Sequence, residues 1–109
     1  MSSDIPESDW RRFKEVHAQA EERYCERVLE EIKVIISTGA AGSAHDRYLR
    51  VYQLIEDRDE QMAKAFNDFR RSTAVMQLGI LRRMKLLTDA ELGLFSELTR
   101  TRIAAIASL

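Results

Sequence analysis

The feature that most constrains the fold is an uncharged run in the second half of the chain. The residues from Ser72 to Leu81 carry no charge, and the apolar pattern continues to Leu87. Projected at about 100° per residue, their apolar side chains point to every side of a helix, so such a helix must be surrounded by protein. The run is too short for a bilayer, which needs about 20 apolar residues. It therefore predicts a buried central helix at about 70–87.

A long amphipathic pattern opens the chain. From Trp10 to Ile36 the apolar residues recur at steps of three or four, which predicts a helix at about 9–36 with one buried face. Residues 1–7 are polar and are expected to form a flexible tail. The small residues of 37–43 follow, with Gly39 where a left-handed helix end is favoured. They predict a hairpin loop between two helices.

Two capping boxes mark further helix starts. Ser43 and Asp46 have the spacing of a capping box and predict a second helix at about 44–69. Thr88 and Glu91 have the same spacing and predict a last helix at about 89–107. The expected fold is a single all-α domain, a four-helix antiparallel bundle built on a long N-terminal helical hairpin.

Composition excludes several classes of protein. The 17 basic and 18 acidic residues give a net charge of −1, so no overall field attracts nucleic acid or a membrane. One cysteine cannot form an internal disulfide, which suits a reducing compartment. The acidic start of the chain differs from the basic, then apolar start of a signal peptide. We therefore expect a cytoplasmic protein.

Catalytic signatures are missing from the sequence. There is no nucleophile elbow, no zinc-protease motif and no dinucleotide-binding glycine motif. A di-iron bundle needs glutamate three residues before histidine on two helices. Lys14 stands at that distance before His17, and Gly42 before His45, so the di-iron interpretation fails. No cofactor and no catalytic residue are predicted.

A weak metal-ligand pattern lies on the hairpin. His17, Glu21 and Cys25 are spaced by four residues and so share one side of the first helix. Three ligands on one helix rarely complete a coordination sphere, so no metal site is predicted. If a divalent metal did bind, His17, Glu21 and Asp59 would be its candidate ligands at the seam between the two helices.

Asp59 interrupts the apolar stripe of the second helix. If paired residues of the hairpin have numbers that sum to about 80, Asp59 faces the turn around Glu21. The prediction is that its carboxylate accepts a hydrogen bond from Tyr24 or His17. Exposure of Asp59 to solvent and a metal site are the alternatives.

Basic residues flank the central run, at Arg70, Arg71, Arg82, Arg83 and Lys85. They could contact a phosphate backbone, which makes them candidate nucleic-acid contacts. The last three also lie at the C-terminal end of the expected helix, where the helix dipole stabilises cations. No turn of the helix-turn-helix kind precedes them.

The stripes of the two long helices and the tail from Ile103 to Leu109 offer more apolar surface than one short inner helix needs. This surplus favours a homodimer or a helical protein partner. The predicted function is a non-catalytic interaction or assembly module. A nucleic-acid-associated regulator that uses the basic cluster is the alternative, and an enzyme ranks third.

Overall fold

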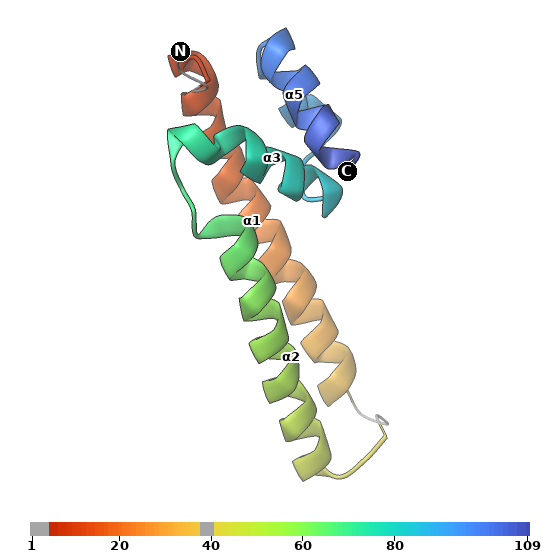
Figure 1. Ribbon diagram of the computed structural model, residues 1–109. Helices are drawn as coiled ribbons and strands as arrows, with labels where there is room; N and C mark the ends of the chain where they lie inside the picture. Colours follow the sequence, from red (N-terminus) through yellow and green to blue (C-terminus); the bar gives the residue numbers. More distant parts are fainter. Residues whose placement is uncertain (1–4, 38–40) are drawn as a thin grey trace.

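A helical hairpin with a globular end makes up the protein. The computed structural model describes residues 5–37 and 41–109, and every regular element in them is a helix. Helices α1 (Glu7–Ile36) and α2 (Ala44–Phe66) run antiparallel, and the shorter helices gather beside the N-terminal half of α1 (Figure 1). The molecule measures 57 × 24 × 24 Å. None of the helices described is long and apolar enough to cross a membrane.

The all-α fold on a long N-terminal hairpin is confirmed, and the structure refines its helices. A 3₁₀ helix, η1 (Arg71–Thr73), leads into α3 (Ala74–Arg83), and α4 (Asp89–Leu92) precedes α5 (Glu97–Ala107). Both capping boxes are present, at Ser43 and at Thr88. Gly39 and residues 1–4, which belonged to the expected loop and tail, lie outside the described residues.

Helix α3 is the innermost element, as the uncharged run predicts. Leu78 and Leu81 have no exposed surface, and four further residues of α3 are also buried, namely Ala74, Val75, Gln77 and Gly79. The helix ends at Arg83 and not at 87, because Lys85 adopts a left-handed conformation with φ 61°. The Leu86 amide then donates to the Leu81 carbonyl at 2.9 Å, which satisfies the end of the helix.

Three further boundaries differ from the predictions. α2 ends at Phe66 and not at 69, because Asn67 caps it and the chain then turns into η1. The expected helix at 89–107 is divided between α4 and α5, because the chain leaves the helix after Leu92 and Ser96 begins a new one in an extended conformation. Ile5, which is expected in the flexible tail, is buried because its apolar side chain joins the core.

The core lies entirely at one end of the molecule. All buried residues of the described part lie at positions 5–24 and 65–103, where α1, the end of α2, α3 and α5 pack together. We call this end the head. We call the rest of the hairpin, Cys25 to Ile36 of α1 and Ala44 to Met62 of α2, the stem. The stem has no buried residue.

Candidate interaction surface

The stem exposes apolar side chains that a monomer leaves uncovered. The two helices partly cover each other along Val28, Ile35 and Leu54, which are half-buried. Beside this seam, Leu29 is 60% exposed and Tyr52 is 57% exposed. Two paired helices can cover only one stripe on each other. A second apolar stripe on α1 and another on α2 therefore remain exposed.

These open side chains share one face of the hairpin. A groove of about 240 Å³ runs between the helices and is lined mainly by Cys25, Leu29 and Ile32 of α1 and by Ile55, Asp59 and Met62 of α2. Helical spacing extends the same face toward the tip of the stem. We call this surface the apolar stem face; its members are Leu29, Ile32, Ile36, Tyr48, Tyr52 and Ile55.

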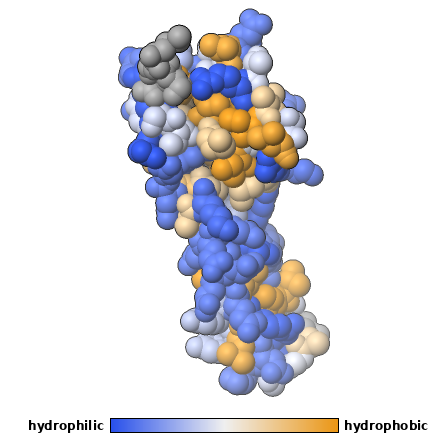
Figure 2. Space-filling model, viewed as in Figure 1, coloured by the Kyte–Doolittle hydropathy of each residue, from blue (hydrophilic) through white to orange (hydrophobic). Residues whose placement is uncertain are grey.

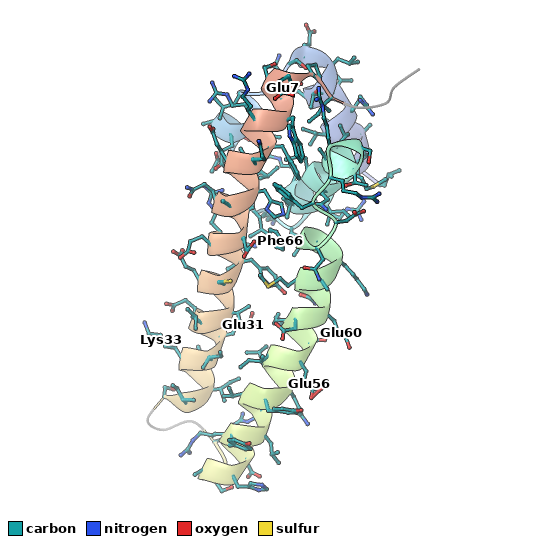
Figure 3. All side chains as sticks on the ribbon, turned by 90° about the vertical axis from the view of Figure 1, so that its left-hand side faces the viewer. Glu7, Glu31, Lys33, Glu56, Glu60 and Phe66 are labelled. Atoms are coloured by element: carbon teal, nitrogen blue, oxygen red, sulfur yellow. The ribbon has the colours of Figure 1, made fainter. Side chains whose placement is uncertain are left out.

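The opposite face of the stem is polar. Arg58 donates to both carboxylate oxygens of Glu31, at 3.1 and 2.8 Å. This pairing lowers the pKa of Glu31. Figure 3 shows Glu31 between the two helices, whereas Lys33 and Glu60 point outward. The difference between the two faces singles out one side of the stem as a candidate interaction surface.

The prediction that Asp59 accepts a hydrogen bond from Tyr24 or His17 is wrong. Asp59 is exposed beside the apolar groove. The Tyr24 hydroxyl donates instead to the Arg58 carbonyl at 2.7 Å, and His17 bonds to the Phe66 carbonyl at 3.3 Å. These contacts join residues whose numbers sum to 82 and 83, so the register lies close to the expected 80 but turns Asp59 outward.

The metal-ligand candidates do not form one cluster. His17 is buried against Phe13, Phe66 and Phe69, and this burial lowers its pKa, although the Phe66 carbonyl and Glu21 act in the opposite sense. His17 therefore lies in the core of the head, whereas Asp59 is exposed on the stem. Among the residues that the structure describes, no group of three histidines, cysteines or acids could hold a metal ion.

Cys25 lies at the edge of the apolar groove and is half-buried. Burial raises the pKa of its thiol, and the nearby carboxylates of Glu21 and Glu22 raise it further. A raised pKa keeps the sulfur as a thiol, which is a poor nucleophile and a poor metal ligand. The side chain therefore contributes apolar surface to the groove.

The four arginines of the predicted basic cluster bind other parts of the head. Each of the four arginines in the predicted cluster contacts a carboxylate or a backbone carbonyl: Arg70 with Asp68, Arg71 with Ile5 and Glu7, Arg82 with Leu87 and Asp89, and Arg83 with Ile106. Lys85 is exposed at the turn that ends α3. These contacts give the arginines a structural role, and nucleic-acid binding by the cluster stays a prediction.

Sequence reasoning missed the two arginines that tie α1 to the turn after α3. Arg23 pairs with Glu91 at 2.6 Å and donates to the Leu86 carbonyl at 2.8 Å. Arg27 donates to the carbonyl of Met84 at 2.7 Å. Their spacing of four residues places them on one side of α1. That side contacts the turn after α3, about 60 residues away in the sequence, and periodicity cannot predict such a long-range contact.

Comparison with known proteins shows which fold the chain has. No family model matches the chain, and no curated protein matches it significantly. Two solved structures are similar, those of the Fluorescence Recovery Protein from Synechocystis sp PCC 6803 and of a point mutant of it. Each has a TM-score of 0.80 and 15% sequence identity, and the match covers 95% of this chain and 98% of that one. The chain has the fold of the Fluorescence Recovery Protein. At this identity the likeness establishes the fold and nothing more.

Proposed function

We propose that the protein is a non-catalytic assembly module that forms a homodimer through the apolar stem face. The observation that carries the proposal is the contrast between the head, which has a core, and the stem, which has none. A helical hairpin without a core is marginal in water, because most helix stability in proteins comes from packing an apolar face. A second stem laid on the first completes a four-helix bundle and supplies that packing.

Burial of the apolar stem face supplies part of the free energy that a dimer needs. Leu29, Ile36 and Ile55 are 60%, 58% and 42% exposed, and a two-fold axis uses each of them twice. Burying the exposed part of such a side chain contributes about 1 kcal/mol, so six of them contribute on the order of 6 kcal/mol. Tyr48 and Tyr52 add contact area with few rotatable bonds. The six aliphatic side chains alone offset an association cost at the lower end of about 4 to 15 kcal/mol, so a micromolar dimer also needs the area that the tyrosines and Ile32 bury.

The non-catalytic part of the proposal rests on the sequence, which carries no nucleophile elbow, zinc-protease motif or dinucleotide-binding motif. Its single cysteine supports a place in a reducing compartment such as the cytoplasm. The arginines engaged within the head leave a nucleic-acid-associated regulator with less support than the dimer.

Hydrogen exchange at two protein concentrations tests the dimer. A stem without a core opens easily, so its amides exchange quickly in the monomer. At high concentration the amides of α2 from Ala44 to Met62 should become protected, while those of α3 stay protected throughout. Exchange of the stem amides that does not depend on concentration would contradict the proposal.

A further inference from the structure

A second groove runs along the polar side of the hairpin up to the head. One section, of about 340 Å³, is lined by Gln61, Lys64, Ala65, Ile80 and Met84. A neighbouring section of similar volume continues between α1 and α2, and Gln61 and Met84 line both sections. The groove therefore joins the outer side of α3 to the polar face of the stem, away from the apolar stem face.

The floor of this groove at the head is apolar and adaptable. Ile80 of α3 and Met84, which follows its last residue, line the groove. Met76 lies one turn before Ile80 on α3, outside the lining, and the spacing of four residues makes the three a stripe about 12 Å long. Met76 is 52% exposed, and the other two are half-buried. Figure 2 shows a broad apolar surface on the head, in the region of α3 and α5, although α5 contributes no residue to the lining of the groove. Methionine side chains adapt to different partners, and a stripe of this length matches about two turns of a docked helix.

The walls of the groove are basic. They carry Arg27, Arg58 and Lys64 and one acid, Glu31, which is already paired with Arg58 at 2.8 Å. Among the ion pairs of the described residues, neither Lys64 nor Arg27 has a carboxylate partner, although the Arg27 guanidinium donates to the carbonyls of Met84 and Lys85. An occupant with carboxylates beside apolar side chains would complement both the floor and the walls.

We propose that this groove binds an amphipathic helix of another protein, with apolar residues against Ile80 and Met84 and acidic residues opposite Lys64 and Arg27. The site lies apart from the apolar stem face, because Arg27 and Glu31 project from the opposite side of α1 to Cys25 and Leu29. A homodimer would thus keep two such grooves free, one in each protomer.

Two designed peptides test the site. Each is a fluorescein-labelled helix of about 14 residues, or four turns, with leucines along one face. One carries glutamates beside the leucines, and the other carries lysines at the same positions. Fluorescence anisotropy at low salt should show that the acidic peptide binds at least about tenfold more tightly than the basic one. The difference should shrink as salt is added, because the paired charges are exposed.

Charge reversal at one lysine locates the binding. Lys64→Glu should weaken the acidic peptide by about fivefold to tenfold, since an attraction becomes a repulsion. Lys14→Glu, the same change at an exposed lysine beside Trp10, should leave the affinity unchanged. Circular dichroism establishes that both variants are folded. Equal affinity for the two peptides would overturn the proposal. So would an affinity for the acidic peptide that Lys64→Glu leaves unchanged.

Two more measurements distinguish this groove from the apolar stem face and from a nucleic-acid site. Leu29→Asp, on the apolar stem face, should leave binding of the acidic peptide intact, whatever it does to the dimer. If Leu29→Asp abolishes binding instead, the peptide occupies the stem face and the groove is not its site. A labelled DNA duplex that binds through Lys64 more tightly than the acidic peptide would overturn the proposal in favour of nucleic acid.

Discussion

Gly79 of α3 lies so close to Ile106 of α5 that no side chain fits between them. A Cβ atom at position 79 would lie 2.2 Å from Ile106 Cγ2 and 2.6 Å from its Cβ, well inside van der Waals contact. The glycine thus determines how closely the two helices approach. Because α5 packs mainly on α3, this contact holds the C-terminal helix in the head.

Gly79→Ala should therefore destabilise the protein, although alanine is normally the better residue inside a helix by about 1 kcal/mol. Forcing a methyl group into a packed contact costs about 1 to 3 kcal/mol. Urea unfolding followed by circular dichroism measures the change. Gly93→Ala is the control, because Gly93 has a helical φ of −63° and a Cβ there would lie 3.3 Å from its nearest atom, the Ala90 carbonyl oxygen. A Gly79→Ala variant as stable as the Gly93→Ala variant would contradict the packing described.

Leu78→Ala should cost about 2 to 5 kcal/mol of unfolding free energy, as truncation of a fully buried leucine does. Leu98→Ala is the matched change on the surface, because Leu98 is 70% exposed, and it should stay within about 0.5 kcal/mol of the parent. The two values come from the same denaturation assay. Similar costs for the two leucines would mean that α3 is not the core of the head.

The burial of Leu78 could be predicted because its signal is local: a helix that is apolar on every side must be enclosed, whatever encloses it. The capping boxes at Ser43 and Thr88 are local in the same sense, since the reciprocal hydrogen bonds span three residues. The turn at Lys85 could not be predicted, because a left-handed lysine has no sequence signature of its own and depends on Arg27, which binds its carbonyl.

The stem face was predicted only in outline. A surplus of apolar residues is visible in the sequence, but its location depends on which side of each helix meets the other. A small rotation of α2 from the expected register turned Asp59 outward and Ile55 into the open groove. Periodicity gives the width of an apolar stripe, and only packing decides which part of it stays exposed.

Asp9 makes stability depend on acid pH. Its buried carboxylate accepts hydrogen bonds from the Ser96 amide at 2.9 Å, the Ser96 hydroxyl at 2.6 Å and the Thr99 hydroxyl at 2.6 Å. Burial alone would raise the pKa of Asp9, but these hydrogen bonds outweigh it and hold the pKa below its ordinary value. The group thereby stabilises the fold above about pH 4, the pKa in an unfolded chain, and this contribution is lost as pH falls through the lower folded pKa.

Asp9→Asn removes this charge while keeping the shape of the side chain. The variant should lose about 1 to 3 kcal/mol at pH 7, because the donors of Ser96 and Thr99 lose their carboxylate. Its stability should also fall less steeply than that of the parent between about pH 4 and pH 2. Urea titrations across this range measure both effects. Parallel pH profiles for parent and variant would show that Asp9 is not the acid-sensitive group.

Homodimer formation through the apolar stem face is the central claim, and light scattering after size exclusion tests it most directly. At micromolar concentration the parent should have twice the 12.6 kDa chain mass. Leu29→Asp should give the monomer mass, because it places a charge in the interface. Val34→Asp should remain a dimer, because Val34 is 72% exposed but projects from α1 about 140° away from Leu29. A parent that elutes with the mass of one chain, or a Leu29→Asp variant that remains a dimer, would contradict the account.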